Sequence, residues 1–132
     1  MKKSILTLSV IALLAGACKK DSTPQSLIVG KWYEKKTVTS HHFTSSTMQD
    51  YTETGIGFTD ADWMIFNSNG TFSVSADLET NGMTGTYSVS GNQLTLNKGT
   101  GTIKTLDAHT LIIDTQETDG NDILSSEKTF SR

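Results

Sequence analysis

The chain has little of what would cross-link it, carry it through a membrane or attract it to nucleic acid. Its 132 residues include one cysteine and one proline, and acidic residues outnumber basic ones by 14 to 11. A single cysteine excludes an intrachain disulfide framework, and an acidic balance lacks the basic face expected of nucleic-acid binding. No apolar run approaches the roughly 20 residues that a membrane-spanning helix needs. We therefore expect no nucleic-acid partner and no spanning helix.

The lone cysteine, Cys18, follows a short apolar segment at the N-terminus. Met1-Lys2-Lys3 is positively charged, residues 5–14 are largely apolar, and the small residues Ala15-Gly16-Ala17 lead into the thiol. This order is typical of an export signal that is removed, and it predicts a signal peptide over residues 1–17. After cleavage, Cys18 is either a free thiol in a secreted protein or a modified residue.

The segment Leu14-Ala15-Gly16-Ala17-Cys18 resembles the lipobox of bacterial lipoproteins, with alanine where leucine is commonest. The resemblance implies that Cys18 is lipidated, that residues 18–26 form a tether, and that the protein is anchored to the bacterial outer membrane. Two or more acyl chains hold a protein firmly on a membrane. Lys19-Lys20-Asp21 is either a solvated tether or similar to the charged segment of surface-exposed lipoproteins, so the periplasmic face and the cell surface both stay open. Without residues 1–17 the chain has nine basic and fourteen acidic residues, a net charge of -5.

Beyond the tether the pattern is typical of β-structure. Asn69-Gly70 and Asn81-Gly82 are strong hairpin signals, and apolar and polar residues alternate between residues 72 and 78. A single helical turn is predicted at residues 24–29. Strands are expected over residues 31–40, 49–58, 62–66, 71–78, 83–89, 93–96, 102–106 with 109–115, and 123–130. Residues 27–132 are predicted to form an all-β domain, an antiparallel up-and-down meander closed into a small barrel of about eight strands, because closure removes unpaired edges.

Three segments of this predicted barrel resemble a known family. Gly30-Lys31-Trp32 looks like the Gly-x-Trp signature of lipocalins, and residues 85–96 and 103–111 resemble small bacterial lipocalin-like domains. The resemblance implies a lipocalin-like barrel in which Gly30 and Trp32 belong to the family motif. It also implies that a basic residue from the last strand packs over Trp32. Lys128 and Arg132 are the two candidates for that residue.

No set of catalytic or metal-ligating residues can be assembled from the sequence. His41-His42 stand in a predicted polar loop over residues 40–47, without a third ligand at motif spacing. The acidic run that starts at Asp114 fails the EF-hand pattern, and Ser125-Ser126-Glu127-Lys128 lacks the partner motifs of Ser-x-x-Lys enzymes. We expect no enzyme activity, no metal and no cofactor.

The sequence predicts binding of a small apolar or amphipathic ligand inside the barrel. A barrel of about eight strands is either filled by its own side chains or holds one modest ligand. The residues expected to line a cavity, or to form the core if none exists, are Tyr51, Phe66, Phe72, Val74, Tyr87, Leu94, Leu96 and Leu111.

The alternative is a non-catalytic cell-envelope interaction subunit that contacts a protein or a glycan. It would use the loop at residues 40–47 or the strand around Trp63 and Ile65, which has large side chains on both faces. If Trp63 and Ile65 were exposed together they would form an apolar surface patch, and such patches usually mark binding. The sequence leaves the identity of a protein partner open.

Overall fold

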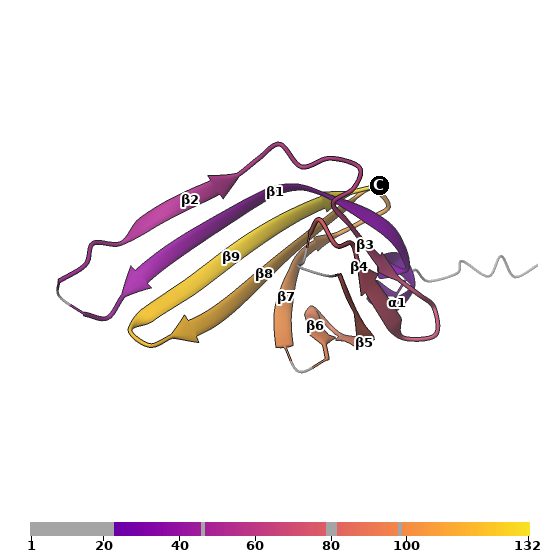
Figure 1. The fold of residues 1–132 in the computed structure, drawn as a ribbon. Helices are drawn as coiled ribbons and strands as arrows, with labels where there is room; N and C mark the ends of the chain where they lie inside the picture. The colour runs from indigo at the N-terminus through magenta and orange to yellow at the C-terminus, as the bar shows by residue number, and fades with distance from the viewer. Residues whose placement is uncertain (1–22, 46, 79–81, 98) are drawn as a thin grey trace, which may run out of the picture.

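The computed structural model describes residues 23–45, 47–78, 82–97 and 99–132 of the chain (Figure 1). Cys18, the predicted signal peptide and Asn81 of the predicted hairpin turn lie outside these residues. The elements are α1 (Pro24–Ile28), β1 (Gly30–Phe43), β2 (Tyr51–Gly55), β3 (Trp63–Phe66), β4 (Thr71–Val74), β5 (Met83–Ser90), β6 (Gln93–Leu96), β7 (Gly99–Leu106), β8 (Thr110–Asp119) and β9 (Asp122–Ser131).

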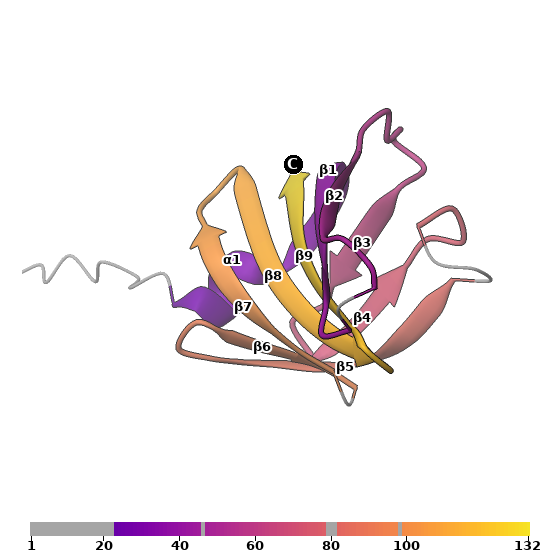
Figure 2. The ribbon, with the colours of Figure 1, turned by 90° about the vertical axis from the view of Figure 1, so that its left-hand side faces the viewer.

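The strands form one antiparallel sheet that closes on itself. Neighbours follow the order β2-β1-β3-β4-β5-β6-β7-β8-β9, and β1 also pairs with β9. This last pairing closes β1 and β3 to β9 into a barrel of eight strands, which Figure 2 shows curling round on itself. The prediction of an all-β, antiparallel barrel of about eight strands is confirmed.

β2 is a ninth strand outside the barrel, which corrects the prediction that residues 49–58 form a barrel strand. One edge of β1 pairs with two different strands. Its first residues, up to Tyr33, pair with β3, and its later residues, from Thr37 onward, pair with β2. A register shift between Glu34 and Lys36 in the ladder with β9 separates the two parts. Residues 37–43 of β1 therefore leave the barrel.

We call the part of the sheet beyond the barrel the projecting sheet. It consists of β2, residues 37–43 of β1, residues 122–128 of β9 and residues 116–119 of β8. Figure 1 shows these strands extending together away from α1. The predicted polar loop over residues 40–47 is thus wrong in its first part, because β1 continues to Phe43 and is held there by ladders with β2 and β9.

The predicted helical turn forms the short helix α1, which packs against the barrel. Thr23 is its N-cap and accepts a hydrogen bond from the Ser26 amide at 3.3 Å, and Pro24 occupies the first turn. Ile28 is fully buried, and the side chain of Gln25 accepts a hydrogen bond from the Val89 amide at 3.1 Å. The folded unit therefore includes residues 24–26, which the sequence had assigned to the tether.

The core follows from the alternation of the strands. In β3 and β4 every second residue is buried, namely Met64, Phe66, Phe72 and Val74. One charged side chain, Glu34, is also fully buried among the described residues, and its carboxylate accepts a hydrogen bond from the Thr37 hydroxyl. Large apolar side chains fill the half of the barrel near α1, and the other half is open.

Candidate functional site

An open cavity lies inside the barrel, toward the strand ends that face away from α1. Its volume is about 610 Å³. Phe66 pairs with Gly30 at the start of β1, whereas Met64 pairs with Trp32 and Val74, so Met64 and Val74 lie farther from α1. The apolar wall of the cavity consists of Met64, Val74, Leu78, Met83, Leu94, Leu96, Ile113 and Phe130.

The structure divides the predicted lining residues into three groups. Val74, Leu94 and Leu96 line the cavity. Phe66, Phe72, Tyr87 and Leu111 are buried in the core beneath it. Sequence alternation placed all seven on inward faces, but it carries no information on depth along the barrel axis.

Tyr51 is the exception, and its assignment to the lining is corrected. It lies in β2, pairs with His41 on the projecting sheet, and is 46% exposed. The strand that was expected to bring it inside never joins the barrel. The cavity residues that sequence reasoning missed, such as Met64 and Ile113, stand in predicted strands where the alternation could have identified them.

Tyr87 in the filled half of the barrel is engaged by its neighbours. The Tyr87 ring meets Phe66 edge-on, with centroids 4.9 Å apart, and its hydroxyl donates to the Asn67 carbonyl oxygen at 2.9 Å. Burial raises the pKa of Tyr87. This hydroxyl is therefore neutral at ordinary pH and engaged in the core.

Charged groups stand at the mouth of the cavity. Half-buried Lys128 and exposed Glu117 both border it, together with Thr115. Lys128 pairs with Ile113 on β8, and Glu117 is four residues farther along that strand, which corresponds to about 13 Å. The cavity thus combines an apolar wall with polar groups at its opening, a composition that suits an amphipathic molecule.

Arg132, directly after β9, covers Trp32 at the closed end. Its guanidinium carbon lies 4.0 Å from the centre of the Trp32 ring, and Nη2 donates to the carbonyl oxygens of Leu27 at 2.5 Å and Val29 at 2.8 Å. The Trp32 indole donates to the Ile28 carbonyl oxygen at 2.7 Å. Of the two basic residues considered from the sequence, Arg132 is the one that contacts Trp32.

Gly30 belongs to the same arrangement. Its φ of +132° lies in a region that favours glycine, and an added Cβ would stand 3.4 Å from the Arg132 guanidinium carbon. These three residues, Gly30, Trp32 and Arg132, therefore connect the end of α1 to β1 and to the end of β9, the first and last strands of the barrel. They do not border the cavity.

Trp63 and Ile65 point outward from β3 and are half-buried. The Lys31 ammonium lies 4.8 Å from the centre of the Trp63 ring, a cation–π contact. Among the described residues, the most exposed large apolar side chains are instead Met48, Tyr51 and Ile56. The predicted surface patch is therefore partly covered.

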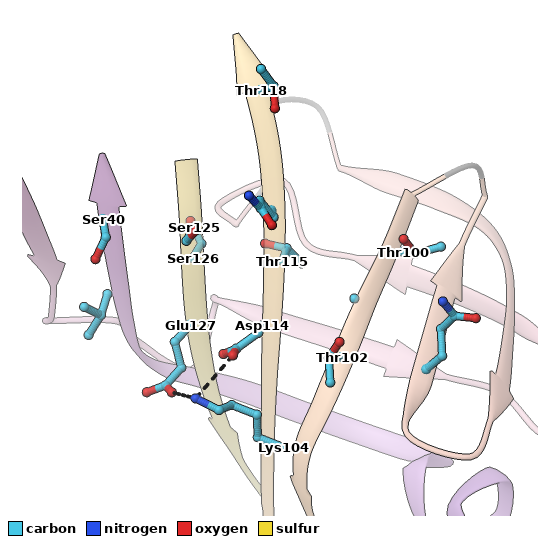
Figure 3. Close-up of a pocket in the computed structure, with 14 residues that line it drawn as sticks. Ser40, Thr100, Thr102, Lys104, Asp114, Thr115, Thr118, Ser125, Ser126 and Glu127 are labelled. Carbon is cyan, nitrogen blue, oxygen red and sulfur yellow. Dashed lines mark hydrogen bonds and ion pairs between the residues drawn. The ribbon is translucent and has the colours of Figure 1, made fainter. Parts of the chain in front are cut away.

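A second hollow, which we call the outer groove, lies on the outward faces of β7, β8, β9 and β1 (Figure 3). Its volume is about 800 Å³. Pairing between β7 and β8 ends at Gly101 and Thr115, and the two strands diverge beyond that point. Thr100, Gly101, Thr115 and Gln116 border both the groove and the barrel cavity.

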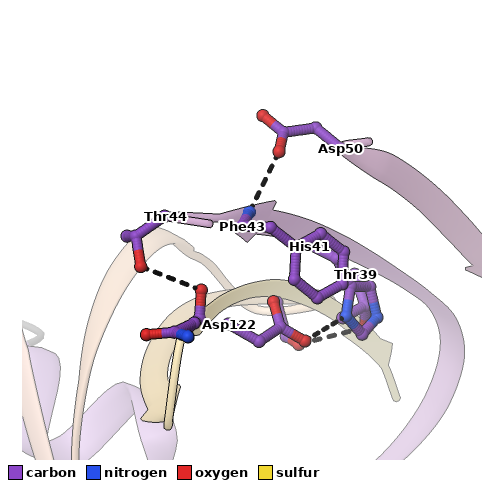
Figure 4. Close-up of polar contacts among 8 residues, drawn as sticks. Thr39, His41, Phe43, Thr44, Asp50 and Asp122 are labelled. Carbon is purple, nitrogen blue, oxygen red and sulfur yellow. Dashed lines mark hydrogen bonds and ion pairs between the residues drawn. The ribbon is translucent and has the colours of Figure 1, made fainter. Parts of the chain in front are cut away.

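The two adjacent histidines are held by separate carboxylates on the projecting sheet. His41 Nδ1 lies 2.8 Å from Asp122 Oδ2, and His42 Nδ1 lies 2.6 Å from Asp50 Oδ2. Figure 4 shows Asp122 beside His41, and Asp50 accepting from the Phe43 amide on the other side of the strand. Hydrogen bonds from His42 and the Phe43 amide lower the pKa of Asp50. No group of three His, Cys, Asp or Glu side chains that could hold a metal occurs among the residues described.

Neither membrane crossing nor known relatives adds to this picture. Within the described part of the chain, no helix has the length and apolar character to cross a membrane. Comparison with models of known families, with curated proteins and with solved structures finds no match to this chain. The functional argument therefore depends on the geometry of the site.

Proposed function

We propose that this protein is a bacterial lipoprotein whose lipocalin-like barrel binds a small apolar or amphipathic molecule without catalysing a reaction on it. The observation that carries the proposal is the open cavity of about 610 Å³, with its apolar wall and its charged mouth. Small-molecule sites have volumes of roughly 300–1,000 Å³ and a mostly apolar lining with few polar groups.

The arrangement at the opposite end supports the lipocalin-like assignment. The Gly-x-Trp resemblance implied a basic residue packed over Trp32, and Arg132 makes that contact. Because this end is sealed by α1 and by large buried side chains, a ligand would enter only from the mouth or through the gap between β7 and β8.

A cavity-filling variant tests ligand binding. Leu96 is half-buried on the cavity wall, so Leu96→Trp is expected to weaken binding of an apolar ligand by about tenfold, because overpacking of a pocket costs about 1–3 kcal/mol. The measurement is saturable labelling of the full chain, as isolated from the cells that make it, by photoactivatable dodecanoic acid, with the labelled peptides identified by mass spectrometry.

Ile112→Trp is the matched control. Ile112 is equally half-buried but points outward from β8, so this variant is expected to label like the parent. Thermal melts of both variants would show that the fold is kept. Labelling that never saturates, or that misses the cavity residues in the parent protein, would overturn the carrier proposal.

We further propose that Cys18 carries the lipid anchor that holds the domain near the outer membrane. The helix begins at Pro24 and Thr23 caps it, so residues 18–22 span at most about 18 Å between the thiol and the folded unit. Cys18→Ser is expected to move the protein from the membrane fraction to the soluble fraction and to abolish incorporation of radiolabelled palmitate. Recovery of a free thiol at Cys18 in the parent protein would contradict this.

The alternative, a non-catalytic envelope subunit that contacts a partner, is favoured by one observation, namely the outer groove. The groove is larger than the barrel cavity and differs from it in chemistry. Its lining points to one class of ligand.

A further inference from the structure

The outer groove is lined almost entirely by short polar side chains. Seven of its fourteen lining residues are serine or threonine, and two are glutamine. Val38 is the one branched aliphatic residue in the lining. Side chains from five strands, β1 and β6 to β9, border it, as Figure 3 shows for Thr102 of β7, Thr118 of β8 and Ser125 of β9. The groove therefore offers hydrogen bonds and almost no apolar surface to bury.

Five polar side chains of this lining have hydrogen-bonding capacity that the described part of the protein does not use. Within the part of the chain that the structure describes, the side chains of Thr100, Thr102, Gln116, Thr118 and Ser125 make no hydrogen bond to another protein group. By contrast, the hydroxyls of Thr59 and Thr71 are used within their own turns. Each hydroxyl or amide of the groove can both donate and accept.

An ionic cluster fixes one end of the groove. Lys104 Nζ lies 2.8 Å from Glu127 Oε2 and 3.2 Å from Asp114 Oδ2. The hydrogen bonds to Glu127 and Asp114 raise the pKa of Lys104, and the hydrogen bond from Lys104 lowers the pKa of Glu127. All three side chains are part-exposed, so the cluster positions the groups more than it stabilises the fold.

Asp114 retains an unused acceptor. Its Oδ1 atom is buried, and no donor among the described residues reaches it. A buried acceptor without a donor costs about 1–3 kcal/mol, so such groups usually serve a ligand or hold water.

We propose that the outer groove binds a neutral glycan. The three charged groups of its lining sum to -1, which disfavours anionic ligands, and the scarcity of apolar surface disfavours lipids. A carbohydrate matches the lining because each of its hydroxyls donates and accepts, as do the side chains that face it. The groove shares four of its fourteen lining residues with the border of the barrel cavity, and its other ten lie outside that cavity, so the proposal does not require the cavity to bind a ligand.

Titration of the isotopically labelled full chain with cellohexaose, maltohexaose, mannohexaose and chitohexaose tests the proposal. At least one of these is expected to shift the amide resonances of Thr102, Thr118 and Ser125, which border the groove and not the barrel cavity, in a saturable way. Hexagalacturonate and a polyalanine hexapeptide serve as anionic and peptide probes. A groove that responds to none of the four neutral hexasaccharides, or that prefers the anionic or the peptide probe, would overturn the proposal.

Variants assign the effect to the groove. Thr102→Val together with Ser125→Ala is expected to weaken sugar binding by about tenfold or more, because it removes two hydrogen-bonding groups that border the groove and not the barrel cavity. Thr84→Val is the matched control, since Thr84 is an exposed strand threonine outside the groove. Thr102→Ser keeps the hydroxyl and is expected to bind like the parent. Equal loss in Thr84→Val would show that the effect is not local to the groove.

Discussion

Replacement of Trp32 by alanine is expected to lower the free energy of unfolding by about 3–5 kcal/mol, the cost of truncating a fully buried aromatic side chain. The loss has three sources: the space left in the core, the hydrogen bond from the indole to Ile28, and the contact with Arg132. The measurement is urea denaturation of the full chain followed by far-ultraviolet circular dichroism.

Trp63→Ala is the control for this experiment. Trp63 is half-buried on the outward face of β3 and contacts Lys31 at the surface, so its truncation is expected to cost about 1 kcal/mol. Similar losses in the two variants would contradict the assignment of Trp32 as the side chain that closes the barrel.

Replacement of Arg132 by alanine is expected to cost about 2–3 kcal/mol, because one charged nitrogen donates to the carbonyl oxygens of Leu27 and Val29. These carbonyls lie at the C-terminal end of α1, where a positive charge is also favourable. The variant should therefore detach the helix as well as destabilise the barrel. Hydrogen exchange at residues 26–29 would report the first effect, and urea denaturation would report the second.

Arg132→Lys separates charge from geometry. Lysine keeps the positive charge but lacks the planar fork that reaches two carbonyls while it stacks on a ring, so an intermediate loss is expected. A change within about 0.5 kcal/mol of the parent for Arg132→Ala would show that the contact with Trp32 is incidental.

The alternation within the strands and the turns between them could be predicted from the sequence because the evidence for them is local. Residues 71–74 alternate between buried and half-buried positions, as their pattern of polar and apolar side chains predicts. The turn at Asn69-Gly70 lies between β3 and β4, and that at Gly91-Asn92 lies between β5 and β6. Alternation and turn chemistry are read from a few neighbouring residues.

The lengths of the strands could not be predicted, because they depend on partners far away in the chain. β1 continues through His41-His42 because β9 and β2 supply ladders there, although the local sequence is polar. β4 ends at Val74, and the Ser75 hydroxyl accepts hydrogen bonds from the Trp63 and Leu78 amides. Neither effect has a signal within the segment itself.

The cavity could not be predicted from the sequence either. Phe72 and Val74 occupy equivalent positions in the same alternating strand, yet one fills the core and the other borders the open space. What separates them is distance from α1, which depends on how the closed sheet and the helix meet. The outer groove likewise requires β7 and β8 to diverge beyond Gly101 and Thr115.

Residue types and their local periodicity thus specified an all-β chain, its turns, its helical cap and the inward side of strands such as β4, but not that of β2. Closure through β1 and β9, the displacement of β2 from the barrel, and the choice of Arg132 as the cover of Trp32 were decided by long-range pairing. The physical reason is that side-chain patterning selects a face of a strand, whereas hydrogen bonds between distant segments select its neighbour and the length over which they pair.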